Sequence, residues 1–301
     1  MGLELYLDLL SQPCRAVYLF AKANRIPFEM QNVELFRGEH MTDEFARVNS
    51  LKRLPAMKDG DFTLAESAAI LHYLSQKYNT PAHWYPRDLQ ARARVEEYLY
   101  WHADSIRGTL GSVLWIQVRQ WACPDGERLG SPYNLPWPLA LVGSLNAFRW
   151  GDRPRWTWGE DFLCGVETEP SSRPQQVLGP LIDIHVPKEK VDRNRAFITQ
   201  LLQHLEQKFL QDKPFLTGDQ ISVADLMALE ELMQTFYAGF DVFEGRPKLA
   251  AWRGRVEATF GEELWQETHE AIRKLCADPK SLKDIPLAMQ EGMKLRLSKI
   301  P

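Results

Sequence analysis

The sequence predicts two domains of different class, a small α/β domain and, after it, a larger all-helical domain. Strand-like and helix-like segments alternate from the N-terminus to about residue 78. A polar stretch with two prolines follows over 79–87, and beyond it apolar residues recur with a helical period in nearly every ordered segment. We therefore expect an α/β domain at 1–78, a linker at 79–87 and an all-helical domain at 88–301.

In the first domain, alternating apolar residues predict strands and helical spacing predicts helices. Strands are expected at 3–7, 28–34, 56–58 and 62–64, and helices at 13–23, 42–48 and 67–78. An Asp59-Gly60 turn between the last two strands requires an antiparallel pair, whereas the helical crossovers favour parallel pairs. The sheet should therefore be mixed.

The second domain is expected to consist of helices at 89–117, 188–210, 223–237 and 247–260. Ser222 and Asp225 stand at the start of the third helix with the spacing of a capping box, in which each side chain bonds a backbone N–H near the other. The apolar residues of the terminal segment 285–301 suit either a lid over a pocket or an amphipathic helix that docks on the core.

Composition narrows the class of protein. The chain has 301 residues, 45% of them apolar, and a net charge of −4, without a run of Lys or Arg that would mark a nucleic-acid surface. The four cysteines form neither a CxxC pair nor a metal-ligand spacing, which favours a reducing cytosol and no metal site. The longest apolar run, 135–148, is too short to span a bilayer and contains two prolines. We expect no membrane span.

Ser11 is the candidate catalytic residue. It stands where the strand at 3–7 leads into the first helix, among unpaired backbone N–H groups and the positive end of the helix dipole. This environment favours a bound anion or thiolate. An ordinary N-cap, with Pro13 in the first helical turn, is the alternative.

Three further groups of residues in the first domain suggest one ligand. A cis peptide at Leu54-Pro55 would leave the Leu54 backbone free to pair with an extended peptide, and the helix start at Glu66-Ser67 suits an ammonium and a carboxylate group. His40 and Arg53 could pair with a second carboxylate. An ordinary trans proline, a plain helix cap and solvated surface residues are the respective alternatives. Together with Ser11, these sites match γ-glutamyl-cysteinyl-glycine, which is glutathione.

Four stretches spread over both domains carry a further signal: "MGLELYLDLLSQPCRAVYLFAKANRIPFE", "LPAMKDGDFTLAESAAILHYL", "HWYPRDLQARARVEEYLYWHADSIRG" and "FLTGDQISVADLMALEELM". They closely resemble the theta-class glutathione S-transferases, in particular the theta-2 type, and the resemblance covers 1–117 and 177–301. It implies a thioredoxin-like domain followed by a helical domain, a homodimer, glutathione as co-substrate without a metal, and small hydrophobic electrophiles as the second substrates.

The resemblance also assigns roles to residues. Ser11 would donate to the glutathione sulfur. The glutathione-binding residues would be His40, Met41, Arg53, Leu54, Glu66, Ser67, Asp104, Ser105, Ile106 and Arg107. Of these, His40 and Arg53 would face the glycyl carboxylate, Leu54 the cysteinyl backbone, and Glu66 and Ser67 the γ-glutamyl end.

Two positions depart from the family, which usually has a lysine at the places of Met41 and Arg53. Met41 removes one possible partner for a carboxylate, whereas Arg53 keeps the charge with a different geometry. The four residues from Asp104 to Arg107 lie on the long helix, and Arg107 could receive an anionic leaving group such as sulfate.

Residues 118–176 match nothing in the family. They hold half of the ten tryptophans and two of the four cysteines, with frequent Pro and Gly. Their removal would join Gln117 to Val177 and restore the running sequence of the family as "LWIQVLGPLI". We hypothesise a translated intron; a genuine lineage-specific loop is the alternative.

Three functions are compatible with these features. The leading one is a cytoplasmic transferase that joins glutathione to hydrophobic electrophiles, with glutathione peroxidase and sulfate-ester side activities; a nuclear pool is also compatible. A glutaredoxin-like thiol oxidoreductase would use Cys14, which lies in the turn where a redox cysteine pair would be expected. A non-catalytic glutathione-binding or adaptor protein is the third, since the segment 118–176 could impair activity. The sequence leaves the electrophile open.

Overall fold

The computed structural model describes residues 2–111, 113, 118–119, 175–176, 187–278, 287, 290–291 and 294. Contacts between residues divide the chain into one unit of 1–119 with 175–301 and a second unit of 120–174. Every element described here belongs to the first unit. Most of the terminal segment 285–301, and with it the predicted lid or docking helix, lies outside the described residues.

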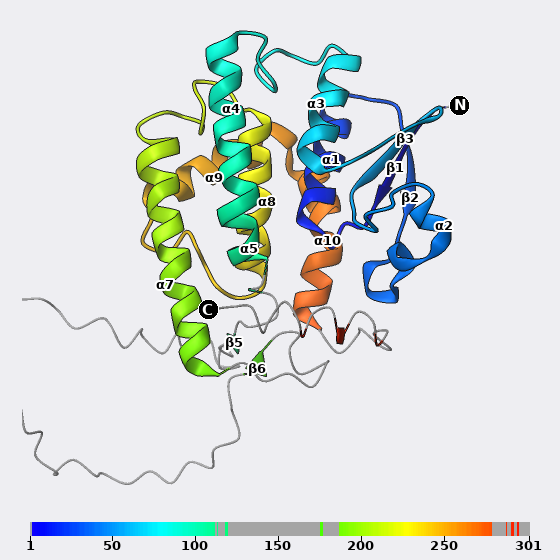
Figure 1. The fold of residues 1–301 in the computed structure, drawn as a ribbon. Helices are drawn as coiled ribbons and strands as arrows, with labels where there is room; N and C mark the ends of the chain where they lie inside the picture. Colours follow the sequence, from blue (N-terminus) through cyan, green and yellow to red (C-terminus); the bar gives the residue numbers. More distant parts are fainter. Residues whose placement is uncertain are drawn as a thin grey trace, which may run out of the picture. The chain divides into compact units, whose positions relative to one another are not determined.

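The N-terminal part is built on a four-stranded sheet with the strand order β2-β1-β3-β4 (Figure 1). The strands are β1 (Leu3–Leu7), β2 (Glu29–Asn32), β3 (Ala56–Asp59) and β4 (Phe62–Ala65). β1 pairs in parallel with β2 and antiparallel with β3, which pairs antiparallel with β4. The predicted mixed sheet is therefore confirmed.

The hairpin between β3 and β4 lies one residue beyond the predicted turn. Asp59 pairs with Phe62, so Gly60 and Asp61 form the two-residue loop rather than Asp59 and Gly60. Gly60 has φ +62°, a conformation that favours glycine at the first loop position because it has no Cβ.

Helix α1 (Gln12–Ala23) is buried on almost all sides because it packs between other elements. It contacts β1 and α3 (Ser67–Lys77) in the N-terminal part and α8 (Val223–Tyr237) and α10 (Glu262–Ala277) in the helical part (Figure 1). Between β2 and β3 the chain forms the short turns η1 (Leu35–Arg37) and η2 (Glu39–Met41) and the helix α2 (Asp43–Ala46). The predicted helix at 42–48 is thus real but shorter.

The predicted helix 89–117 is divided by a wider π-helical turn. α4 (Leu89–Trp101) continues into η3 (His102–Ile106), where the helix widens, and then into α5 (Arg107–Leu110). α7 (Lys188–His204) likewise ends in a π-helical turn, η5 (Leu205–Leu210). α8 and α9 (Pro247–Phe260) have the predicted bounds, and α10 was not predicted.

Helix α8 forms the core of the helical part, with every residue from Val223 to Thr235 buried. The predicted capping box at its start is confirmed: Ser222 Oγ accepts from the Ala224 N–H at 3.2 Å, and Asp225 Oδ2 accepts from the Ser222 N–H at 2.9 Å. The segment 79–87 packs against this start through buried Trp84, whose C=O accepts from the Val223 N–H at 3.0 Å.

Two short strands flank the second unit. β5 (Val118–Arg119) pairs antiparallel with β6 (Gln175–Gln176), so Val118 lies opposite Gln176. The chain therefore enters and leaves 120–174 at neighbouring points. Among the described residues, no helix is long and apolar enough to cross a membrane.

Candidate functional site

Ser11 lies at the N-cap of α1, directly after β1. Its N–H donates to the Asp8 carbonyl at 2.9 Å, and its C=O accepts from the Arg15 N–H at 3.0 Å. Ser11 is 7% exposed, and its side chain makes no capping hydrogen bond to the helix. The hydroxyl of Ser11 thus differs from that of an ordinary N-cap serine, because the helix terminus does not use it.

The Ser11 hydroxyl forms a hydrogen bond with the Cys14 thiol. Cys14 is fully buried, and burial raises its pKa to about 12, although hydrogen bonds from the Asp8 backbone and the Ser11 side chain act in the opposite direction. A thiol with such a pKa stays protonated at neutral pH and is a poor nucleophile. This burial argues against a redox role for Cys14.

The η2 turn places His40 and Met41 beside the segment that leads to β3. His40 is buried, its Nδ1 has no hydrogen-bond partner within the described residues, and burial lowers its pKa, which favours the neutral ring. Met41 is 45% exposed, and its carbonyl accepts from Lys52 Nζ at 2.7 Å. Lys52 therefore brings an ammonium group to the place where Met41 lacks one, and the sequence analysis missed it.

Arg53 and Leu54 follow in an extended segment. Arg53 is exposed and its carbonyl accepts from Asn49 Nδ2 at 2.8 Å; across the described part of the chain, no hydrogen bond or ion pair joins its side chain to His40. The Leu54-Pro55 peptide is cis, which is the alternative that the proposed peptide-pairing site requires. Because β3 begins only at Ala56, the backbone of Leu54 takes part in no strand pairing with the described strands.

Glu66 and Ser67 start α3 with an unusual backbone. Glu66 is the N-cap with φ +70°, a conformation that costs a non-glycine residue about 1–3 kcal/mol and that occurs often at ligand sites. The Glu66 side chain does not cap this helix start, and the Glu66 carbonyl accepts from the Ile70 N–H at 2.9 Å. Free N–H groups at this terminus suit a carboxylate.

The π-helical turn η3 and the start of α5 carry the other predicted residues. Asp104 is exposed and accepts a hydrogen bond from Ser105 Oγ at 3.2 Å, whereas Ile106 is buried in the main core. Arg107 is 39% exposed and forms an ion pair with Glu231 of α8, which is 1% exposed. Widened helical turns are frequent at functional sites.

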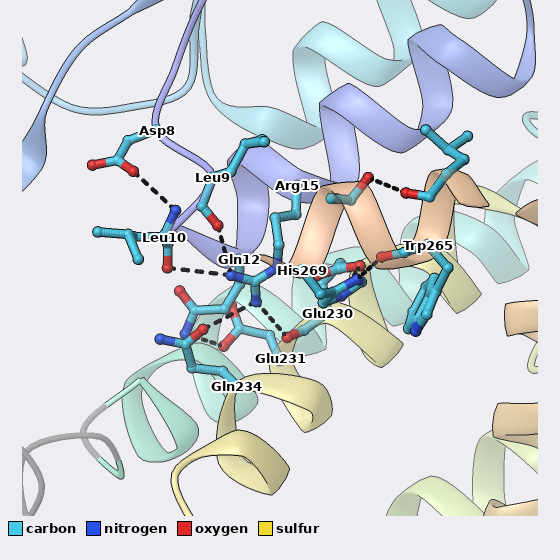
Figure 2. A network of polar contacts seen from close by, with 12 residues as sticks. Asp8, Leu9, Leu10, Gln12, Arg15, Glu230, Glu231, Gln234, Trp265 and His269 are labelled. Carbon is cyan, nitrogen blue, oxygen red and sulfur yellow. Dashed lines mark hydrogen bonds and ion pairs between the residues drawn. The ribbon is translucent and has the colours of Figure 1, made fainter. Parts of the chain in front are cut away.

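A buried polar network joins the first turn of α1 to α8 (Figure 2). Arg15 Nε donates to Glu230 Oε2 at 2.6 Å, and its Nη2 donates to Gln234 Oε1 at 3.0 Å. Arg15 Nη1 also donates to the carbonyls of Leu9 and Leu10 just before Ser11, at 3.0 and 3.2 Å. The network therefore fixes the loop that presents Ser11.

On the far side of Glu230, the network continues to α10 (Figure 2). His269 Nε2 lies 3.2 Å from Glu230 Oε1, and His269 Nδ1 lies 2.8 Å from the Trp265 carbonyl. Burial acts to raise the pKa of Glu230, but its interactions with the neighbouring His269 and Arg15 lower it overall. The carboxylate is therefore ionised at neutral pH.

Two surface hollows lie away from these residues. One, of about 250 Å³, is lined by Arg94, Glu97, Lys208, Phe209, Gln211, Lys213 and Leu216. The other, of about 290 Å³, is lined by Tyr18, Lys22, Ile26, Pro27, Phe28 and Met30. Neither of these two hollows is lined by a predicted site residue.

Comparison with known proteins decides the family. The family model of the glutathione S-transferase N-terminal domain matches residues 3–76, and that of the C-terminal domain matches 161–259. The chain is 49% identical over its whole length to human glutathione S-transferase theta-2 and 46% identical to the mouse theta-2 protein, with full coverage of both relatives. The chain belongs to the theta-class glutathione S-transferases.

Solved structures agree with this assignment of the theta-class chain. The crystal structure of human glutathione transferase theta-2 in complex with glutathione matches with a TM-score of 0.77 and 48% identity, covering both chains completely. A human theta-class structure with the glutathione conjugate of 1-menaphthyl sulfate matches with a TM-score of 0.78. The C-terminal family model begins at residue 161, inside the predicted non-family segment 118–176.

Proposed function

We propose that this theta-class chain joins glutathione to hydrophobic electrophiles and that Ser11 stabilises the thiolate. The observation that carries the proposal is the buried Ser11 hydroxyl at the start of α1, which no capping bond uses. A donor in this position can turn to a bound sulfur. The N–H groups at the α3 terminus, which Glu66 does not cap, would hold the γ-glutamyl part of glutathione. The Leu54 backbone, which pairs with none of the described strands, would hold the cysteinyl part, and His40 the glycyl part.

The chemistry needs the thiolate, because a free thiol with a pKa of about 8.5 is mostly protonated at neutral pH. A hydrogen bond to a charged group contributes about 1.5–3 kcal/mol, and a helix N-terminus about 0.3–1 kcal/mol. Together these can lower the thiol pKa by about 1–3 units at about 1.36 kcal/mol per unit. The thiol proton passes to solvent, the sulfur forms a bond to the electrophilic carbon, and the leaving group departs with its electron pair.

Arg107 would receive an anionic leaving group. Its side chain is partly exposed beside the buried Glu231, and a guanidinium can bind two sulfate oxygens at once. A human relative has been crystallised with the conjugate of 1-menaphthyl sulfate, which supports sulfate esters as one substrate class. Reduction of hydroperoxides by the same thiolate would be a second activity.

A direct assay separates this function from a non-catalytic adaptor. The full chain is mixed with glutathione and 1-menaphthyl sulfate, and the thioether product and free sulfate are quantified. We expect both to form in equal amounts above the uncatalysed rate. Saturable glutathione binding without product would favour the adaptor, and reduction of a mixed disulfide instead would favour an oxidoreductase.

We also infer a homodimer in the cytosol. The N-terminal part exposes large apolar side chains at Met41, Leu51 and Phe62, and α4 exposes Leu89 and Tyr100. A contiguous group of exposed apolar side chains commonly marks a protein interface, and we infer that these residues contribute to one. Analytical ultracentrifugation should give twice the mass of the chain, and Phe62→Glu should lower the mass to that of a monomer.

We propose the domain boundaries 1–78, 79–87 and 88–301, with 118–176 as a translated intron. The pairing of Val118 with Gln176 supports this, because the neighbouring ends would allow the shorter chain to close without the block. The separation of 120–174 as its own unit agrees within two residues. Sequencing of spliced transcripts tests the idea, and a dominant transcript that contains the block in several tissues would refute it.

A further inference from the structure

Glu231 lies at the meeting point of three elements. Its carboxylate is 1% exposed on α8, where Oε1 forms the ion pair with Arg107 of α5 and Oε2 accepts from Gln12 Nε2 of α1 at 3.2 Å. His102 Nε2, on the π-helical turn, lies 3.9 Å from Oε1. Gln12 directly follows Ser11 in the chain. One buried carboxylate therefore contacts both the arginine and the helix turn of the candidate site (Figure 2 shows Gln12 beside Glu231).

The geometry leaves Arg107 with donors to spare. A guanidinium has five N–H groups, and the ion pair with Glu231 uses Nη1. Because the Arg107 side chain is 39% exposed, its other N–H groups can meet a ligand from solvent. Without an anchor, a long arginine side chain would sample many rotamers and would lose that freedom on binding an anion.

The Glu231 carboxylate holds Arg107 effectively because it is buried. Solvent and salt screen exposed ion pairs strongly, but they reach a carboxylate that is 1% exposed only weakly. The second oxygen of Glu231 is held in place by Gln12, so the carboxylate cannot turn away from Arg107 without losing a hydrogen bond. The arginine is therefore held in advance of the ligand, which reduces the entropy cost of binding.

We propose that Glu231 is a positioning residue that holds Arg107 in place for an anionic leaving group such as sulfate. This rests on the proposed transferase function and assigns sulfate-ester selectivity to a residue that need not touch the substrate. The neighbouring Glu230 is equally buried but contacts Arg15 and His269 instead. Loss of Glu230 should therefore affect the fold and all activities alike.

The test compares Glu231→Gln with Glu230→Gln as a matched control. The kcat/KM of each variant is measured with 1-menaphthyl sulfate and with cumene hydroperoxide. The hydroperoxide releases no sulfate-like anion. We expect Glu231→Gln to lower the ratio of kcat/KM for 1-menaphthyl sulfate to kcat/KM for cumene hydroperoxide about tenfold. The fall should lie mainly in the value for the sulfate ester, because Arg107 loses its fixed position. In Glu230→Gln the ratio should stay within about twofold.

A double mutant links the effect to Arg107. In an Arg107→Ala background, Glu231→Gln should change the ratio no further, because the group that it positions is gone. An additive loss, or an equal fall in both activities of Glu231→Gln, would overturn the proposal. If Glu231→Gln does not fold, Glu231→Asp keeps the charge on a shorter arm and should show a smaller loss with the same selectivity.

Binding of inorganic sulfate provides a readout that needs no turnover. The Nε–H resonance of Arg107, assigned with Arg107→Ala, should shift on addition of sulfate, and Glu231→Gln should bind sulfate about tenfold more weakly. Equal sulfate binding by the parent and Glu231→Gln would refute the positioning role. If the parent protein has no transferase activity but still binds sulfate more tightly than Glu231→Gln does, only the proposed transferase function is refuted.

Discussion

Replacement of Ser11 by alanine should separate catalysis from stability. A serine that caps a helix usually contributes about 0.5–2 kcal/mol to stability through its side-chain hydrogen bond. The Ser11 side chain makes no such capping bond, and its hydrogen bond with the Cys14 thiol involves a weak hydrogen-bonding group, so Ser11→Ala should lower the free energy of unfolding by less than about 0.5 kcal/mol. The backbone hydrogen bonds of Ser11 to Asp8 and Arg15 remain in the variant.

The effect on the thiolate should be much larger. Loss of a hydroxyl donor to a charged sulfur removes about 1.5–3 kcal/mol, which raises the pKa of bound glutathione by about 1–2 units. The helix terminus still contributes, so we expect kcat/KM at neutral pH to fall about 10-fold to 100-fold and glutathione affinity to fall less.

Ser222→Ala is the matched control, because Ser222 caps α8 with its side chain and lies in the capping box. This variant should lose about 1 kcal/mol of stability without a change in the pKa of bound glutathione. Urea unfolding and initial-rate kinetics measure the two effects. A Ser11→Ala enzyme with the parent rate, or with a stability loss equal to that of Ser222→Ala, would refute the reasoning.

Four further results are expected. Cys14→Ala should keep the kcat/KM of glutathione conjugation within about twofold of the parent value, since a thiol with a pKa of about 12 stays protonated. If Cys14→Ala instead loses only thiol–disulfide exchange activity, the oxidoreductase alternative is restored. Glu230→Gln should cost about 3–5 kcal/mol in urea unfolding because it leaves the buried Arg15 without its anion, and a cost under 1 kcal/mol would contradict the buried pair. Asp225→Asn should cost about 1–3 kcal/mol, since one carboxylate accepts from Leu216, Ser222 and Trp252; unchanged thermal unfolding would exclude this role. Burial lowers the pKa of His102, which favours the neutral ring in the folded protein. The neutral ring therefore contributes stability above the ordinary histidine pKa of about 6.5, and this contribution is lost as the pH falls further below that value. His102→Gln should reduce the dependence of the unfolding free energy on pH in this range, and an unchanged slope would contradict the burial.

Local signals in the sequence predicted the elements whose determinants are close in the chain. The alternation in β1, the Ser222 and Asp225 pair, and the bounds of α8 and α9 all follow from neighbours within a few residues. At Leu54-Pro55 the sequence leaves a cis and a trans peptide open, and the structure has the cis peptide that the proposed ligand site requires. These features need little tertiary information.

The parts of the site that depend on distant residues could not be predicted. Arg15 and Glu230 are 215 positions apart, and nothing near either residue indicates the other. The π-helical turn before Arg107 was also missed, because the apolar spacing of the predicted helix does not reveal one extra residue in a turn. By contrast, α10 carries a signal that could have been used, since Trp265, Ile272 and Cys276 are buried at helical spacing.

The most direct test of the central claim is an ultraviolet difference titration of glutathione bound to the full 301-residue protein. The thiolate absorbance is followed across pH against free glutathione. We expect a midpoint about 1–3 units below the value of about 8.5 for a free thiol. A midpoint at or above the free value, in folded protein that binds glutathione, would contradict stabilisation of the thiolate by Ser11.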